Sequence, residues 1–259
     1  MNIKEIAKKI IPDFLIGRLG INHGIQKFAF DRGSSIRNDI QSKYGFHGDL
    51  LDFYVNNEKQ IIHKWHHYIP IYDRYFSRFR GTNCRFLEIG VSEGGSLQMW
   101  RRYFGDKATI FGIDINKNCL QFNGLHGQVR IGSQDDADFL QSVIEEMGGI
   151  DVVLDDGSHH MRHVRDTFGF LFKKLNTGGV YMIEDLHTAY WRQCGGSYHS
   201  KLNFFRFIGD VMHDMHHWYH DVSIKHAGIS GVCSGVHIHD SIAVFEKDPV
   251  YRPTHSKVG

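Results

Sequence analysis

Short apolar runs alternate with amphipathic segments along most of this chain. The clearest case is residues 150–155 and 178–183, two runs rich in Val and Ile. Between them, Val164, Phe168 and Leu171 recur at helical spacing, which predicts a helix between two strands. A crossover of this length joins parallel strands. The two runs are therefore predicted to end at the same edge of one sheet, about 5 Å apart if the strands are neighbours.

The same alternation continues on both sides of this unit. It predicts strands over residues 85–90, 108–113, 129–132, 222–229 and 241–247, and helices over 97–103, 137–147 and 200–219, with Leu202, Phe205, Ile208, Met212 and Met215 on the apolar face of the last one. Strands separated by helical segments are typical of a mostly parallel sheet with helices on both faces. The sequence thus predicts a single α/β domain.

The first eighty residues predict a helical extension in front of this domain. An apolar stripe over residues 1–19 is interrupted by Pro12 and Asp13. It is too short and too charged for a signal peptide or a membrane span, although its basic residues leave a membrane-surface contact open. We expect residues 1–80 to form a cap or an oligomerisation surface and residues 81–259 to form the α/β domain.

Aromatic residues in this extension follow helical spacing. Positions 65, 68, 72, 75 and 76 are all Trp, Tyr or Phe, which predicts a packing face. The alternative for His66, His67, Tyr68 and Tyr72 is that they line the mouth of a ligand site.

Composition narrows the class of protein. Apolar residues make up 41% of the chain, charged residues 23%, and the net charge is +1, so no global field directs the protein to nucleic acid. The four cysteines show no CxxC spacing, which argues against a zinc site and a disulfide framework and favours a reducing cytoplasm. Histidine is frequent, with 19 residues, but HExxH is absent. A cluster in the last predicted helix is interpreted as surface or packing residues: His213, His216, His217 and His220.

Acidic residues follow both runs of the central unit. Asp155 and Asp156 end the first run, Glu184 and Asp185 end the second, and His159 follows shortly after the first pair. Open α/β sheets bind ligands outside the carboxyl ends of their strands. Crowded carboxylates cost free energy unless a cation or protons compensate them, and Mg²⁺ prefers such oxygen ligands. The alternative is that these acids cap helices, with Asp156 or Ser158 starting the next one.

A glycine-rich turn follows the first strand of the domain. Glu88, Gly90, Gly94 and Ser96 mark this turn, and Asp114 ends the next strand, where an acid can accept ribose hydroxyls. These features suit a nicotinamide dinucleotide or an adenosyl ligand. An acid two residues before the first glycine repels pyrophosphate but attracts an ammonium group. The pattern therefore favours S-adenosylmethionine over NAD.

Further along, Ser133 and Gln134 follow the third strand, where they can hydrogen-bond an adenine edge, and Asp135 or Asp136 starts the next helix. The full set of candidate cofactor-binding residues is Glu88, Gly90, Gly94, Ser96, Asp114, Ser133, Gln134 and Asp155.

Taken together, these motifs resemble the class I S-adenosylmethionine-dependent methyltransferases. More narrowly, the combination of Asp156, His159, Glu184 and Asp185 is similar to the macrolide sugar O-methyltransferases of the mycinamicin and macrocin type and to cephalosporin hydroxylase-like proteins, from about Trp65 to the C-terminus. The resemblance implies a Rossmann-like, seven-stranded sheet closed by an antiparallel pair. It also implies that Asp156, Glu184 and Asp185 hold Mg²⁺ and that His159 is the general base.

The resemblance leads to a functional expectation. We expect a Mg²⁺-dependent O-methyltransferase that acts on a hydroxyl of a sugar, in a small-molecule or glycan acceptor, and that works as a homo-oligomer. The alternatives are an O-methyltransferase for an aromatic diol or antibiotic precursor, a non-catalytic Rossmann-like binding protein, and, less well supported, an NAD-dependent enzyme.

Overall fold

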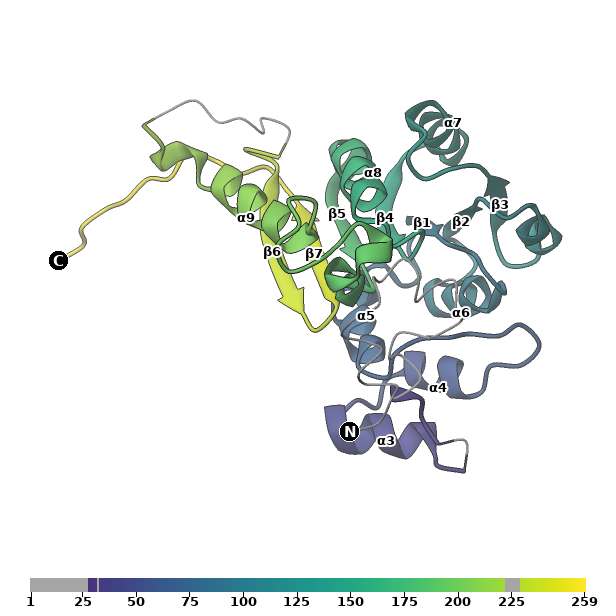
Figure 1. Cartoon of the computed structure of the whole chain (residues 1–259). Coiled ribbons are helices and arrows are strands. Elements are labelled where there is room, and N and C mark those ends of the chain that lie inside the picture. The colour runs from purple at the N-terminus through teal and green to yellow at the C-terminus, as the bar shows by residue number, and fades with distance from the viewer. Residues whose placement is uncertain (1–27, 32, 222–228) are drawn as a thin grey trace, which may run out of the picture.

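The computed structural model describes residues 28–31, 33–221 and 229–259. These residues form one seven-stranded sheet in the order β3-β2-β1-β4-β5-β7-β6 (Figure 1). The strands are β1 Arg85–Ile89, β2 Thr109–Asp114, β3 Gln128–Ile131, β4 Ile150–Asp155, β5 Leu175–Ile183, β6 Cys233–His239 and β7 Ile242–Lys247. Strands β1 to β5 pair in parallel, and β7 runs antiparallel to both of its neighbours. The expected mostly parallel sheet with an antiparallel end is confirmed.

Helices cover both faces of this sheet. They are α3 Ile36–Tyr44, α4 Asp49–Val55, α5 Tyr68–Phe76, α6 Gly95–Phe104, α7 Ala137–Met147, α8 Met161–Lys174 and α9 Phe204–Met215, with short 3₁₀ helices η2 Ser77–Phe79, η3 Lys117–Phe122, η4 Leu186–Tyr190, η5 Arg192–Cys194 and η6 His217–Tyr219. Residues of α7, α8 and α9 share one hydrophobic cluster, and those of α3 to α6 share the other (Figure 1). The sheet therefore has a separate core on each face.

Alternation along the strands decides which side chains enter which core. Successive strand residues point to opposite faces. Val153 belongs to the core under α7 and α8, and Leu154 belongs to the core under α5 and α6. By the same alternation, Asp155 enters the α7–α8 layer, and Glu88 enters the α5–α6 layer with Phe86. The two buried carboxyl groups thus lie on opposite sides of the sheet.

The segment before β1 packs directly on the sheet. Ile40, Leu50 and Tyr72 belong to the same buried cluster as Phe86 and Trp100. These residues therefore contribute to the core that supports β1. Whether residues 1–80 act as a cap or an oligomerisation surface stays a prediction, and the predicted N-terminal stripe lies outside the described residues. Within the described residues, no helix is long and apolar enough to cross a membrane.

Two predictions near the C-terminus need correction. The strand that pairs with β7 at the end of the sheet is β6. Of the predicted strand over 222–229, residues 222–228 lie outside the described residues, and Ile229 lies in a turn. Strand β6 contains Gly235 and half-exposed histidines, so it lacks a clear apolar alternation and is defined by its pairing with β7. The predicted helix over 200–219 is also shorter. Its first turn begins after Asn203, whose side chain accepts a hydrogen bond from the amide of Phe205.

The buried face of α9 also differs from the prediction. Phe204, Ile208 and Val211 are buried, whereas Leu202 lies before the helix and is 40% exposed, and Met212 is 48% exposed. Asn203 moves the start of the helix forward, so the apolar stripe begins at Phe204.

Candidate functional site

The two predicted acid pairs meet at one sheet edge. Strands β4 and β5 are neighbours, with Asp155 paired to Ile183. The amide of Glu184 donates to the carbonyl of Asp155 at 3.1 Å, and the amide of Asp156 donates to the carbonyl of Ile89 at 2.9 Å. The ends of β1, β4 and β5 are thus held side by side. For β4 and β5, this confirms the common sheet edge that the strand–helix–strand pattern predicted.

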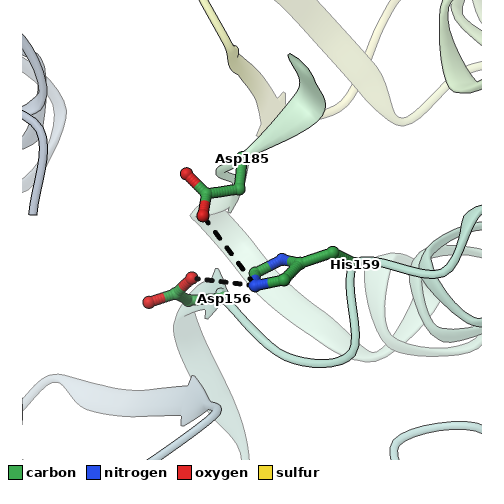
Figure 2. Close-up of side chains that lie close together, drawn as sticks. All are labelled: Asp156, His159 and Asp185. Carbon is green, nitrogen blue, oxygen red and sulfur yellow. Dashed lines mark ion pairs between the residues drawn. The ribbon is translucent and has the colours of Figure 1, made fainter. Parts of the chain in front are cut away.

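Asp156, Asp185 and His159 converge at this edge. Nε2 of His159 lies 3.8 Å from Oδ1 of Asp156 and 3.8 Å from Oδ2 of Asp185 (Figure 2). One ligand atom from each of the three residues lies within 4.8 Å of the others, the one such group found in the described part of the chain. Two carboxylate oxygens at this separation suit a hard divalent cation.

The backbone at two of these residues has an uncommon conformation. His159 has φ 54° and Asp185 has φ 59°, both in the left-handed region. Residues other than glycine rarely adopt this backbone region, and holding one there costs about 1–3 kcal/mol of stability. Thr188 contacts both turns: its Oγ1 donates to the carbonyl of His159 at 3.4 Å, and its amide donates to the carbonyl of Asp185 at 3.0 Å. Such a cost is common at ligand sites, where it fixes the direction of a side chain.

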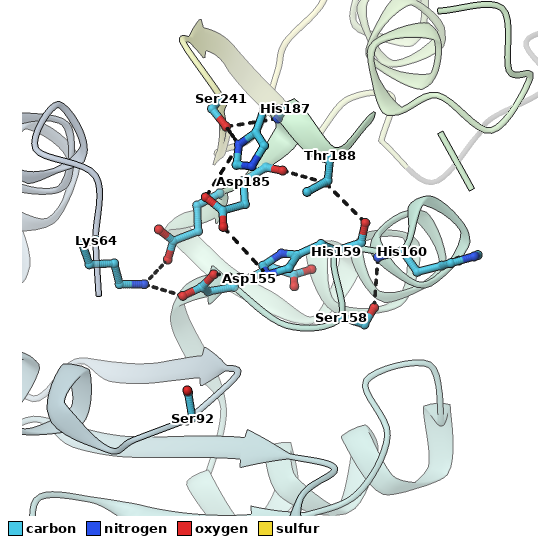
Figure 3. Close-up of polar contacts among 12 residues, drawn as sticks. Lys64, Ser92, Asp155, Ser158, His159, His160, Asp185, His187, Thr188 and Ser241 are labelled. Atoms are coloured by element: carbon cyan, nitrogen blue, oxygen red, sulfur yellow. Dashed lines mark hydrogen bonds and ion pairs between the residues drawn. The ribbon is translucent and has the colours of Figure 1, made fainter. Parts of the chain in front are cut away.

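Lys64 joins the acid cluster from the segment before α5. Its ammonium Nζ donates to Oδ2 of Asp156 and to Oε1 of Glu184, each at 2.5 Å (Figure 3). The lysine side chain is only 4% exposed. Burial alone would lower the pKa of Lys64, but the carboxylates of Asp156 and Glu184 outweigh it and raise that pKa well above its usual value. Lys64 is therefore a buried cation inside the site.

Two tyrosines of α5 complete the set of donors. The hydroxyl of Tyr68 donates to Oδ1 of Asp185 at 2.8 Å, and that of Tyr72 donates to Oε2 of Glu184. Burial and the neighbouring carboxylates raise the pKa of both phenols, which keeps them protonated as donors. Tyr68 and Tyr72 belong to the buried aromatic packing face that the sequence predicted, and their hydroxyls also reach the acids. His66 and His67 instead contact Asp39 and the carbonyl of Asp240, so a ligand mouth lined by all four residues stays a prediction. The sequence analysis missed Lys64. Lys64 lies in a segment without regular secondary structure just before α5, so no periodicity in the sequence indicated its place.

Glu88 lies deep below the glycine turn. Its Oε2 accepts from Oγ of Ser96 at 2.8 Å, and its Oε1 accepts from Nε1 of Trp100 at 3.1 Å. The side chain is fully buried. Burial raises the pKa of Glu88 to about 7, against the pull of nearby Lys64. Glu88 therefore anchors the start of α6 from beneath the turn.

Asp114 supports the turn from β2. Its Oδ2 accepts hydrogen bonds from the amides of Val91 and Ser92, both at 3.0 Å. Gly94 has φ 75°, and a Cβ there would meet the ring of Phe122 at 2.6 Å. Glycine at position 94 is thus required both by its backbone conformation and by its packing against Phe122 of η3.

Gln134 and Asp155 form a network on the other side of the sheet. Nε2 of Gln134 donates to Oδ1 of Asp155 at 3.2 Å, and Oε1 of Gln134 accepts from the amide of Ser158 at 2.6 Å. The hydroxyl of Tyr181 donates to Oδ2 of Asp155 at 3.0 Å. Burial raises the pKa of Asp155 to about 6. The side chain of Asp155 therefore lies apart from the cluster of Asp156.

The remaining predicted residues act locally in the structure. The hydroxyl of Ser133 donates to Asp135, and Asp136 caps α7 by accepting from the amides of Asp138 and Phe139. Helix α8 has His160 as its N-cap residue, so neither Asp156 nor Ser158 holds that position. The contacts of Ser133, Gln134 and Asp155 with a cofactor stay predictions.

Comparison with known proteins places this arrangement in context. Residues 87–186 match the family described as methyltransferase domain. The chain is 38% identical over 198 residues to the 8-demethyl-8-(2-methoxy-alpha-L-rhamnosyl)-tetracenomycin-C 3'-O-methyltransferase of Streptomyces olivaceus, covering 71% of this chain and 50% of that protein. It is 41% identical over 138 residues to the mycinamicin VI 2''-O-methyltransferase of Micromonospora griseorubida, covering 51% of this chain and 34% of that protein.

A solved structure agrees with these relatives. The methyltransferase MycE from the mycinamicin biosynthetic pathway, in complex with Mg and SAH, has a TM-score of 0.68 and 28% identity, covering 83% of this chain and 55% of that chain. The chain is related to the macrolide and polyketide sugar O-methyltransferases. The Rossmann-like methyltransferase fold expected from the sequence is thereby confirmed. The chain spans about half the length of the tetracenomycin relative, and about a third of the length of the mycinamicin relative.

Proposed function

We propose that this chain transfers a methyl group from S-adenosylmethionine to a hydroxyl of a sugar on a small glycosylated molecule, with the help of Mg²⁺. The observation that carries the proposal is the position of Nε2 of His159, 3.8 Å from one oxygen of Asp156 and 3.8 Å from one oxygen of Asp185. A base beside two carboxylate oxygens that can hold a cation is an arrangement suited to deprotonating a weakly acidic alcohol. Relatives that methylate rhamnosyl and mycinamicin acceptors support the substrate class.

The cofactor is proposed from the turn after β1. S-adenosylmethionine carries an ammonium and a sulfonium group and no phosphate. Glu88 lies beneath this turn and Asp114 beside it, so the local field favours a cationic ligand over a pyrophosphate. The complex of MycE with SAH supports the same choice.

The metal is proposed at the acid cluster. Asp156 and Asp185 would hold Mg²⁺ through oxygens that face His159, and the family resemblance adds Glu184. When bound, Mg²⁺ supplies a Lewis acid that polarises the acceptor hydroxyl. The structure of MycE with Mg, SAH and mycinamicin VI, 27% identical to this chain, supports a metal in such a site.

The chemistry of the protein side chains follows from their positions. Nε2 of His159 takes the proton of the acceptor hydroxyl, and the oxygen then attacks the methyl carbon as its bond to sulfur breaks. Tyr68 holds Asp185 through a 2.8 Å hydrogen bond, which fixes the carboxylate opposite the base. Positioning of this kind lowers the entropic cost of bringing two reactants together.

Of the alternatives, a purely structural role is disfavoured because Asp156, Asp185 and His159 converge on a common point. An aromatic diol as acceptor would use the same residues. The homo-oligomer and the cytoplasmic location expected from the sequence stay predictions.

One experiment tests the proposal in two steps. Calorimetry with S-adenosylhomocysteine and with NAD⁺ should give micromolar binding for the first and no heat for the second. Purified protein with methyl-labelled S-adenosylmethionine and Mg²⁺ should then label rhamnosyl-tetracenomycin or mycinamicin VI, and exhaustive chelation should abolish the labelling. Binding of NAD⁺ in place of the adenosyl ligand would overturn the proposal, and labelling that survives chelation would remove the metal from it.

A further inference from the structure

Aromatic rings gather next to Asp185, beside the acid cluster. The ring of His187 contacts those of Trp65 and Trp191, with centroids 5.5 Å and 4.9 Å away. Nδ1 of His187 lies 3.9 Å from Oδ1 of Asp185. Two indole rings from distant parts of the chain are therefore placed beside one of the proposed metal-binding carboxylates.

The ring of His187 is held from the turn between β6 and β7. Its Nδ1 lies 2.7 Å from Oγ of Ser241, and the same oxygen accepts a hydrogen bond from the amide of His187 at 3.1 Å (Figure 3). A ring that is held in this way limits the movement of the two indoles that contact it. His187 thus links Trp65 and Trp191 into one aromatic surface.

The backbones of the two tryptophans are anchored as well. The carbonyl of Trp65 accepts a hydrogen bond from the amide of Tyr68 at 3.0 Å. The amide of Trp191 donates to the carbonyl of Thr188, and its carbonyl accepts from the amide of Gly196, both at 2.9 Å. Because both indoles are carried by hydrogen-bonded turns, a ligand that binds against them loses little affinity to the ordering of the protein.

Burial distinguishes these indoles from the aromatic core. Tyr68 and Tyr72 are 0% exposed, whereas Trp65 and Trp191 are only partly buried. Sites for small molecules combine aromatic surface with a few polar groups that fix the orientation of the ligand. Here the acids and His159 are the polar groups, and the two indoles supply the apolar surface beside them.

We propose that Trp65 and Trp191 bind the apolar face of the sugar ring whose hydroxyl is methylated. A pyranose carries hydroxyls around its rim and C–H groups on its faces, so one hydroxyl can reach His159 while a face rests on the indoles. The C–H hydrogens are slightly positive and are attracted to the negative face of an indole. This inference rests on the proposed function, because it assigns a subsite to the acceptor of that reaction.

The test uses methyl α-L-rhamnopyranoside, a sugar ring without an aglycone, with protein that is saturated with S-adenosylhomocysteine and Mg²⁺. Saturation-transfer NMR measures its Kd. Trp65→Leu and Trp191→Leu should each raise this Kd about tenfold, the upper range for the loss of an aromatic contact. Unchanged Kd values in both variants, or no binding of the glycoside to the wild type, would overturn the proposal.

The matched control is Trp218→Leu, the same substitution at a different site. Trp218 lies in η6 and is 41% exposed. Its replacement should leave the Kd of the glycoside within about twofold of the wild-type value, as for an ordinary surface substitution. A rise equal to that of Trp65→Leu would show a nonspecific effect of tryptophan removal and would overturn the proposal.

Rhamnosyl-tetracenomycin separates the sugar from its aglycone as the group on the indoles. If the sugar lies there, each leucine variant should raise the KM of this acceptor by the same factor as the Kd of the rhamnoside, while kcat stays nearly unchanged. A rise in KM without a change in the Kd of the rhamnoside would place the aglycone on the indoles and overturn the proposal.

Further measurements separate binding from folding. Trp65 also packs against the core under α5 and α6, so Trp65→Phe, which keeps an aromatic face, should recover most of the affinity lost in Trp65→Leu. Affinities for S-adenosylhomocysteine and for Mn²⁺, a spectroscopic probe of the Mg²⁺ site, should match the wild type in every variant. Parallel losses of all affinities would show that the indoles serve the fold and would overturn the proposal. Turnover with unchanged KM in both leucine variants would overturn this inference alone, whereas adenosyl binding without turnover of any glycoside would overturn the proposed function as well.

Discussion

The backbone of Gly90 lies against the backbone of Asp156, so closely that a Cβ on Gly90 would come within 2.2 Å of the carbonyl oxygen of Asp156. Gly90 also has φ 95°, in the left-handed region. One position therefore couples the turn after β1, where we place the cofactor, to the end of β4, where we place the metal. The closeness of the two proposed sites depends on the absence of a side chain at this position.

The first prediction follows from this contact. Gly90→Ala should destabilise the protein by about 3 kcal/mol or more, at the severe end of single substitutions, and should weaken S-adenosylhomocysteine and Mn²⁺ binding together. Gly124→Ala is the matched control, because Gly124 has φ 80° but nothing within 4 Å of its Cβ position. It should cost only the conformational strain, about 1–2 kcal/mol. Urea unfolding and calorimetry measure both effects, and similar losses in the two variants would contradict the argument.

The second prediction concerns the base. His159→Ala should lower kcat by about 10²–10⁴-fold, the usual contribution of general-base catalysis, while Mn²⁺ affinity stays nearly unchanged, since hard cations prefer oxygen. His160→Ala is the control, because the ring of His160 lies against Gly195 and His163, away from the acids. It should retain most of the activity. Loss of Mn²⁺ binding in His159→Ala would make His159 a metal ligand instead of the base.

The fold was largely predictable because its elements are defined by burial. The predicted helix over 137–147 coincides with α7, whose Leu140, Val143, Ile144 and Met147 are buried at helical spacing. Strand β6 was not predictable in the same way. It is the edge strand of the sheet, several of its side chains are only half-buried, and its residues carry no alternation that a sequence pattern could show.

The candidate site was predictable to the extent that chain topology brings residues together. Asp156 and Asp185 follow neighbouring strands, so their meeting follows from the strand–helix–strand pattern. Lys64 lies 92 positions before Asp156 and 120 positions before Glu184, in a segment without regular secondary structure. No periodicity determines where such a segment crosses the sheet edge, and only the packing of α5 on the sheet places its ammonium between the acids.

The third prediction concerns the network below the site. Tyr181→Phe removes the hydroxyl that donates to Oδ2 of Asp155 and leaves a buried carboxyl group with one donor fewer. The free energy of unfolding should fall by about 1–3 kcal/mol, the cost of an unsatisfied buried polar group. Tyr219→Phe serves as control, because Tyr219 is 69% exposed and should change stability by less than about 0.5 kcal/mol. Mn²⁺ affinity should be unaffected, since Asp155 lies on the opposite side of the sheet; a loss would place Asp155 in the metal site.

The last prediction concerns pH. Burial raises the pKa of Glu88 from its usual 4.5 to about 7, so the folded protein binds a proton in a pH range where the unfolded chain has already released it. Stability therefore decreases as pH rises from about 4.5 to about 7, and the full cost of the buried charge is present above pH 7. At about 1.4 kcal/mol per pKa unit, this cost is on the order of 3 kcal/mol.

Glu88→Gln removes the ionisation but retains the shape of the side chain. Urea titrations give the unfolding free energy of the variant and of the wild type at each pH. The difference, variant minus wild type, should rise by on the order of 2–3 kcal/mol from pH 5 to pH 8. The control is Glu93→Gln, at an exposed position on the same turn, whose difference from the wild type should be the same at both pH values. Because the comparison is made within one variant across pH, the loss of hydrogen bonds to Ser96 and Trp100 cancels to first order. A difference for Glu88→Gln that does not change with pH would mean that Lys64 and the buried donors keep the carboxylate ionised throughout, and Glu88 would then act as a permanent negative charge beneath the turn.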